Sequence, residues 1–136
     1  MSAKGEMDMK QFSIEIKNRV GELAKVTELM AEHAINILAV ACETAGSKPM
    51  IRVVTEDQAS TRKALSRSGR DFSEQDIIVV RMMDRPGELA KMARRLAREG
   101  INVESLYIFG KARGMTEIAL AVDDHKRAKV VLDIRD

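Results

Sequence analysis

Apolar and polar residues alternate near the start of each half of the chain. Residues 12–16 (FSIEI) follow the period of two that is typical of a half-buried strand, and residues 77–83 (IIVVRMM) form a more apolar counterpart. After a short turn, apolar residues recur three and four positions apart, which predicts a helix with one buried face. The two predicted stripes are Leu23, Val26, Met30 and Ala34 in the first half, and Leu89, Met92, Leu96 and Gly100 in the second.

Each half continues with the same order of patterns. Apolar runs predict a second strand, turn-rich segments predict a hairpin, and a third strand follows. Acidic pairs before the next polar segment favour the start of a second helix. The predicted second strands are 35–42 and 101–109, the turns 45–49 and 110–114, the third strands Met50–Thr55 and Glu117–Val122, and the second helices begin near Gln58 and His125.

The two halves are also similar residue by residue. At an offset of 66 residues (87 − 21), residues 12–43 align with residues 78–109 without a gap, and nine of the 32 pairs are identical. Two copies with so long a period do not make a solenoid, so we predict two similar small domains, at 10–75 and 76–136. The identical pairs are Arg19/Arg85, Gly21/Gly87, Glu22/Glu88, Leu23/Leu89, Ala24/Ala90, Lys25/Lys91, Ala31/Ala97, Ile35/Ile101 and Asn36/Asn102.

The predicted order is that of an α+β, ferredoxin-like βαββαβ sandwich. Residues 71–75 can supply a short fourth strand for the first copy. The second copy either lacks its last strand or forms it from residues 132–135. Copies of about 60 residues are marginal alone, so we expect them to pack side by side. We expect one continuous sheet, joined through the edge strands 38–42 and 104–109.

Composition narrows the classes of function. The formal net charge is only +2, the single cysteine excludes an internal disulfide and a cysteine-based metal cluster, and aromatic residues make up 3%. The polar N-terminal segment lacks the apolar stretch of a signal peptide, and no run reaches the length of a membrane span. We therefore expect a cytoplasmic protein without a membrane partner. Cys42, in an apolar strand, is interpreted as a small core residue.

The duplicated turn offers the clearest candidate chemistry. A helix that starts directly after a tight turn leaves its first backbone N–H groups unpaired, and with the helix dipole these groups bind small anions. Gly21 and Gly87 allow close approach to that backbone, although each glycine could equally serve only to turn the chain. Substitution of Gly87 by valine should therefore block ligand approach and spare the fold, provided that its φ is negative.

These motifs resemble the ACT domain, a regulatory module that binds amino acids. The resemblance rests on residues 84–89 (DRPGEL) with 100–103 (GINV), and on residues 18–23 (NRVGEL) with 34–37 (AINI). It extends over both copies, roughly residues 11–133. Val20 departs from the pattern, because the family favours proline there. In such pairs of domains, the turn before the first helix of one domain faces the start of the second strand of the other.

The resemblance implies two ligand sites between the copies. In each, N–H groups at the helix start take the ligand carboxylate, and polar side chains take its ammonium. Asn36 and Asn102 could instead stabilise their own helix–strand junctions. One implied site joins Asn18, Gly21, Glu22 and Leu23 to Asn102 and Val103; the other joins Asp84, Gly87, Glu88 and Leu89 to Asn36 and Ile37.

No serine–histidine–aspartate, paired-carboxylate or metal-ligand pattern is present, so we expect no catalytic residues, no metal and no cofactor. A basic stripe at Lys91, Arg94, Arg95 and Arg98 suits a solvated face or a helix pair better than nucleic acid. The sequence thus predicts a non-catalytic sensor, expected to be a homodimer, that binds an amino acid or related metabolite and regulates an enzyme or transcription factor. The alternatives are an interaction module without a ligand and, more remotely, an acylphosphatase-like enzyme.

Overall fold

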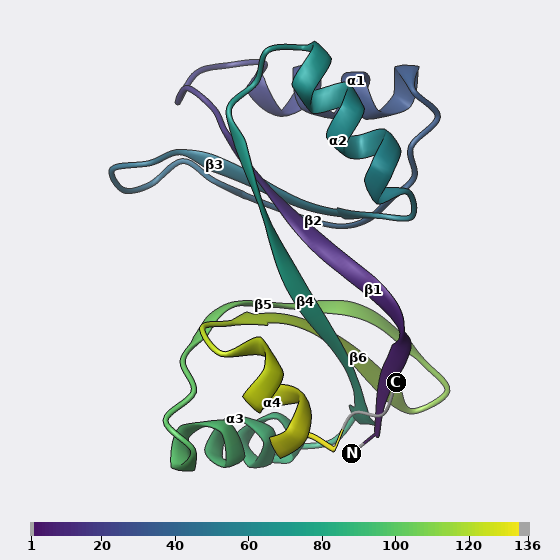
Figure 1. Ribbon diagram of the computed structural model, residues 1–136, viewed down its shortest axis with the longest axis vertical. Coiled ribbons are helices and arrows are strands. Elements are labelled where there is room, and N and C mark those ends of the chain that lie inside the picture. The colour runs from purple at the N-terminus through teal and green to yellow at the C-terminus, as the bar shows by residue number, and fades with distance from the viewer. Residues whose placement is uncertain (1, 134–136) are drawn as a thin grey trace. The chain divides into compact units, whose positions relative to one another are not determined.

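The computed structural model of the protein describes residues 2–133, with side chains from residue 9 onward. Ten elements follow one another in the order expected for two copies of strand–helix–strand–strand–helix (Figure 1). They are β1 (Ser2–Glu15), α1 (Glu22–Glu32), β2 (Ile37–Glu43), β3 (Met50–Thr55), α2 (Gln58–Arg67), β4 (Phe72–Met83), α3 (Glu88–Arg98), β5 (Val103–Ala112), β6 (Met115–Val122) and α4 (His125–Val131). The sheet order is β2-β3-β1-β4-β6-β5.

The chain divides into two compact units. We call Lys10–Gln75 the first unit, and Met1–Met9 with Asp76–Asp136 the second unit. In the first unit, β3 lies between β1 and β2 and pairs with both in antiparallel fashion. Helices α1 and α2 lie on the same face of these strands (Figure 1). Its core is formed by Phe12, Ile14, Val26, Met30, Ile35, Ile51, Val53, Ala64 and Leu65.

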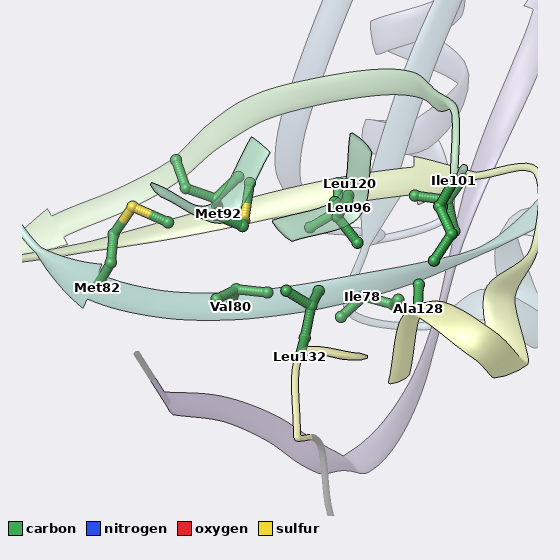
Figure 2. Close-up of a cluster of buried hydrophobic side chains, with 11 residues drawn as sticks. Ile78, Val80, Met82, Met92, Leu96, Ile101, Leu120, Ala128 and Leu132 are labelled. Atoms are coloured by element: carbon green, nitrogen blue, oxygen red, sulfur yellow. The ribbon is translucent and has the colours of Figure 1, made fainter. Parts of the chain in front are cut away.

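The second unit has the same construction. Strand β6 pairs in antiparallel fashion with β4 and β5, and α3 and α4 lie together on one face of them (Figure 1). Figure 2 shows how Met92 and Leu96 of α3 meet Ile78, Val80 and Met82 of β4 in a core without aromatic rings. Ala128 of α4 and Leu132, just after that helix, belong to the same cluster. So do Ile101, Ile118, Leu120 and Val122. Burial of these aliphatic side chains holds helix to sheet.

The helices begin where the sequence predicts. Asp57 and Asp124 are the N-caps of α2 and α4, and their carboxylates accept hydrogen bonds from the backbone N–H groups of Ser60 and Arg127. Such caps satisfy N–H groups that the helix itself leaves unpaired. The third strand of the first copy, Met50–Thr55, also has the predicted bounds.

The strands at the junction of the two copies differ from the prediction. The expected fourth strand at 71–75 and the expected strand at 77–83 are one continuous strand, β4. Strand β1 begins at Ser2, and its residues up to Met9 belong to the second unit. There β1 is the neighbour of β4 and takes the place of the last strand. Leu132 and Asp133 form a turn instead, and residues 134–136 lie outside the described part of the chain.

The expected pairing of edge strands 38–42 and 104–109 is wrong. Strands β2 and β5 lie at opposite ends of the strand order, because β1 and β4 are neighbours in its middle. Cys42, on the edge strand β2, is exposed rather than part of the core. Leu23 and Leu89, expected on the buried helix stripes, are each 45% exposed, because the first turn of each helix presents them to solvent.

Candidate functional site

The two turns before α1 and α3 have nearly the same backbone conformation. Gly21 (φ 92°, ψ −5°) and Gly87 (φ 90°, ψ −13°) are the N-caps, and neither helix has a side-chain cap. A φ near +90° favours glycine, since a Cβ atom is disfavoured there. The Gly87→Val test of ligand approach required a negative φ at Gly87. Because φ is positive, valine would strain the turn itself, and the substitution cannot test ligand approach alone.

Backbone donors remain available at both helix starts. Within the described residues, the first intrahelical acceptors of α1 and α3 are the carbonyl oxygens of Gly21 and Gly87, which bind the N–H groups of Lys25 and Lys91 at 3.0 Å. The N–H groups of the residues between each glycine and lysine precede this first bond. Among these groups, only the N–H of Glu88 has an acceptor within the described residues, the Arg85 carbonyl at 3.4 Å. Leu23 and Leu89 thus each combine a free backbone N–H group with an exposed apolar side chain.

Glu22 holds the first turn in place. Its carboxylate accepts a hydrogen bond from the Lys17 backbone N–H at 3.1 Å and from Arg19 Nε at 3.2 Å, with Lys25 Nζ 3.5 Å away. The Lys17 N–H, helped by the two cations, lowers the pKa of Glu22 to about 2 although burial opposes this shift. A buried acid thus fixes the loop, and the cations around it leave the turn with a surplus of positive charge.

Glu88 has the corresponding position in the second turn. Its carboxylate lies 2.9 Å from Lys91 Nζ and 3.5 Å from Arg85. The bond from Lys91 is the main cause that lowers the pKa of Glu88. Asp84, at the start of the turn, donates its backbone N–H to the Gly114 carbonyl at 2.8 Å and pairs with Lys111 Nζ at 3.2 Å. Both predicted acids of this turn are therefore already paired with cations.

The two repeated asparagines connect strand ends. Asn36 donates its side-chain amide to Glu56 at 3.1 Å and accepts the Glu56 backbone N–H at 3.1 Å. The backbone N–H and carbonyl of Asn102 bind Asp123 in the equivalent place, at 2.9 and 3.1 Å. These bonds support the interpretation that both asparagines stabilise the junction between helix and strand in their own copy. Among the described residues the side-chain amide of Asn102 has no partner, whereas that of Asn36 is engaged by Glu56.

Comparison with known proteins places this architecture in a family. The sequence matches the family model described as an ACT domain pair over residues 7–135. The chain belongs to this family. No curated protein matches the sequence of this ACT domain pair.

Solved structures share the fold of the ACT domain pair. Protein BT0572 from Bacteroides thetaiotaomicron is 26% identical with a TM-score of 0.84, and the match covers 96% of this chain and 90% of that one. The ligand-free regulatory subunit of aspartate kinase from Thermus thermophilus is 19% identical (TM-score 0.71, covering 98% and 93%). The corresponding subunit from Thermus flavus is also 19% identical (TM-score 0.69, covering 98% and 95%).

The predicted site residues of the ACT pair fall into two sets. Asn18, Gly21, Glu22, Leu23, Asn36 and Ile37 belong to the first unit, and Asp84, Gly87, Glu88, Leu89, Asn102 and Val103 to the second. Ile37 and Val103 open β2 and β5 and are partly buried. The expected pairings of Asn18 with Asn102 and of Asp84 with Asn36 join residues of different units. Those pairings stay predictions.

The cations that hold the turns were not among the predicted site residues. Arg19, Lys25, Arg85 and Lys91 pair with the two glutamates. The same residue types stand at these positions in both copies, and this repetition is the sequence signal that could have identified them. Beside the first turn lies a shallow hollow of about 320 Å³, whose charged lining is Glu15, Lys17, Arg70 and Asp71 together with the Arg19–Glu22–Lys25 group. Its four cations exceed its three acids by one charge.

Two absences concern the described residues only. Within residues 2–133, no group of three histidine, cysteine, aspartate or glutamate side chains could hold a metal ion. In the same range, no helix is long and apolar enough to cross a membrane.

Proposed function

We propose that this ACT domain pair is a non-catalytic regulatory protein that binds a free amino acid, or a closely related metabolite, at the turns before α1 and α3. The observation that carries the proposal is the duplication of one turn geometry, with φ of 92° and 90° at the two N-cap glycines. Membership of the ACT family supports it. The regulatory subunits of aspartate kinase, whose fold the chain shares, support a regulatory rather than catalytic role.

The chemistry of the turns suits a small zwitterion. The ligand carboxylate accepts hydrogen bonds from the N–H groups of the first helical turn, Leu23 or Leu89 among them, and gains from the helix dipole. Polar side chains at the turn, Asn18 in the first copy and Asp84 in the second, accept bonds from the ligand ammonium. Charged hydrogen bonds contribute about 1.5–3 kcal/mol each, and the loss of ligand motion offsets part of this gain. An affinity between about 1 mM and 1 μM follows.

The exposed leucines allow binding to be tested separately from folding. Leu89→Glu places a carboxylate beside the N–H groups that the ligand needs, while an acid in the first turn favours the helix dipole. Leu89→Gln has nearly the same shape without the charge and is the matched control. At about 4 Å, like charges in water repel by about 1 kcal/mol, which corresponds to roughly fivefold weaker binding. Leu23→Glu and Leu23→Gln repeat the test at the first turn.

Calorimetric titration of the purified protein with the twenty standard amino acids provides the measurement. We expect at least one to bind, the glutamate variants to bind it about fivefold more weakly or worse, and the glutamine variants to bind it nearly as the wild type does. Urea unfolding should show that the glutamate variants are as stable as their glutamine controls. The proposal is wrong if none of the amino acids binds with a dissociation constant below about 10 mM, a value that corresponds to weaker binding than the range given above. An interaction module without a ligand then takes its place.

Regulation of a partner and self-association are further parts of the proposal. Binding at a turn can shift the equilibrium of a partner only if the ligand prefers one of two states of the assembly. Strands β2 and β5 end the strand order, and edge strands are natural surfaces for pairing with another chain. We therefore propose a homodimer that acts on an enzyme or a transcription factor. Sedimentation equilibrium with and without the bound amino acid tests whether the protein is a homodimer.

A further inference from the structure

The second turn contains an ion pair that has no counterpart in the first. Lys111, near the end of β5, places its Nζ atom 3.2 Å from Oδ1 of Asp84. In the first copy the residue equivalent to Asp84 is the neutral Asn18. The strand pairing, in which Glu43 of β2 corresponds to Gly110 of β5, places the neutral Thr44 at the position of Lys111. Both members of the pair therefore change together, from charged to neutral.

The β5–β6 hairpin presents Lys111 to Asp84 in a fixed place. Asp84 donates its backbone N–H to the carbonyl of Gly114, in the turn of this hairpin, at 2.8 Å. Lys111 is paired with Thr116 in the ladder between β5 and β6, so its backbone is held by the sheet. The side chains of Asp84 and Lys111 remain 45% and 52% exposed, so a solute can reach the pair.

We propose that Lys111 is a built-in competitor for the ammonium group of a ligand at the second turn, and that it determines the selectivity of this site. The inference rests on the proposed function, in which Asp84 accepts the ligand ammonium. The ammonium of Lys111 has the same charge and the same donors as an α-ammonium. A ligand must displace it from Oδ1, or bind Oδ2 against its repulsion.

The consequence is a difference between the two turns. The first turn offers an uncharged Asn18 without a tethered cation, and the second offers a carboxylate that already has one. Removal of Lys111 should strengthen the binding of α-amino acids, because their ammonium group no longer competes. The same change should not strengthen the binding of the corresponding carboxylic acids that lack the amino group, since these acids do not need Asp84. Lys111 therefore discriminates by the amino group of the ligand.

The experiment compares Lys111→Met with the parent protein. Both carry Leu23→Glu, which weakens ligand binding at the first turn. Calorimetry with the twenty standard amino acids, and with the des-amino acid of each one that binds, gives the affinities. Exposed ion pairs are worth little, so we expect a gain of about 1.4- to 5-fold for the amino acids and none for the des-amino acids. The gain should shrink between about 0.05 and 0.5 M sodium chloride as screening increases.

Three variants control the experiment. Lys126→Met removes a cation from α4 of the same unit without touching Asp84, and should leave affinity unchanged. Asp84→Asn combined with Lys111→Met should show no gain over Asp84→Asn alone, because the contested carboxylate is absent. Lys111→Gln, a second replacement that keeps a polar side chain, should reproduce the gain if methionine disturbs the strand.

The outcomes separate this inference from the proposed function. If amino acids bind at the second turn but both Lys111 variants leave their affinity unchanged or lower it, the inference is wrong and the proposed function stands. An equal gain for amino acids and des-amino acids also overturns it, because the effect would then be general. If no amino acid binds the wild type or either Lys111 variant, the proposed function fails and the inference fails with it.

Discussion

Ala34 and Gly100 occupy the same position after α1 and α3, so the two copies end their first helices with different residues at an equivalent site. Each helix ends with two backbone bonds of the Schellman type. The N–H groups of Ala34 and Ile35 bind the carbonyls of Ala31 and Met30 at 3.0 and 2.9 Å. The bonds of Gly100 and Ile101 to Ala97 and Leu96 are both 3.0 Å. The position requires a positive φ, which is 53° at Ala34 and 70° at Gly100.

Exchange of these two residues should therefore change stability in opposite directions. A left-handed conformation costs a residue with a Cβ atom about 1–2 kcal/mol. Glycine, for its part, loses more entropy on folding, which costs about 0.4–1 kcal/mol. From the midpoints of these ranges, Ala34→Gly should raise the free energy of unfolding by about 0.8 kcal/mol, and Gly100→Ala should lower it by a similar amount. No atom lies within 4 Å of a Cβ added at Gly100, so its cost is that of the backbone alone.

Urea unfolding followed by circular dichroism measures both changes. Ala93→Gly is the matched control, because Ala93 is exposed within α3 and has helical backbone angles. Glycine should destabilise that position by about 1 kcal/mol, the reverse of its effect at residue 34. Equal destabilisation by Ala34→Gly and Ala93→Gly would refute the reasoning. A neutral Gly100→Ala would refute it as well.

Three other predictions concern the turns and caps. Gly87→Ala should lower the free energy of unfolding by about 1–2 kcal/mol because φ is 90°, whereas Gly110→Ala, where φ is not positive, should not; equal unfolding midpoints in urea would contradict this. Glu22→Gln should destabilise the protein at pH 7. The pKa of Glu22 is about 2 in the fold and about 4.5 in the unfolded chain, so its stabilisation is complete above the higher value and is lost as pH falls toward the lower. Thermal unfolding at several pH values should show the difference between variant and wild type shrinking over that range. Asp57→Ala should cost about 1 kcal/mol, because the cap of α2 loses its hydrogen bond to Ser60; hydrogen exchange slower at α2 than in the wild type would contradict it.

The sequence by itself determined the order of elements and the family. Local chemistry decides these features: the period of apolar residues places strands and helices, and the N-cap aspartates Asp57 and Asp124 mark helix starts. The repeat located both glycine turns, because nine identities over 32 pairs leave little freedom in the alignment. The structural role of Asn36 and Asn102 was also among the interpretations that residue type alone allowed.

Only the tertiary structure decided how strands are shared. A strand pattern shows that a segment is extended and which residues alternate, but it does not name the partner strand. The polar segment before residue 10 therefore gave no sign that β1 extends from Ser2 and takes the place of the last strand of the second unit. Likewise, residues 71–75 and 77–83 were predicted as separate strands, because burial changes along β4 while its backbone continues.

The partners of the charged side chains at the turns were also decided in three dimensions. Glu22 and Glu88 appeared in the sequence as candidate ligand contacts, and the structure shows that their carboxylates bind the cations of their own turns. Lys111 is 27 positions from Asp84, a separation that no helical or strand period connects. Their contact exists because β6 of the β5–β6 hairpin pairs with β4, which ends just before Asp84. Pairing between distant segments is a property of the folded chain rather than of local sequence.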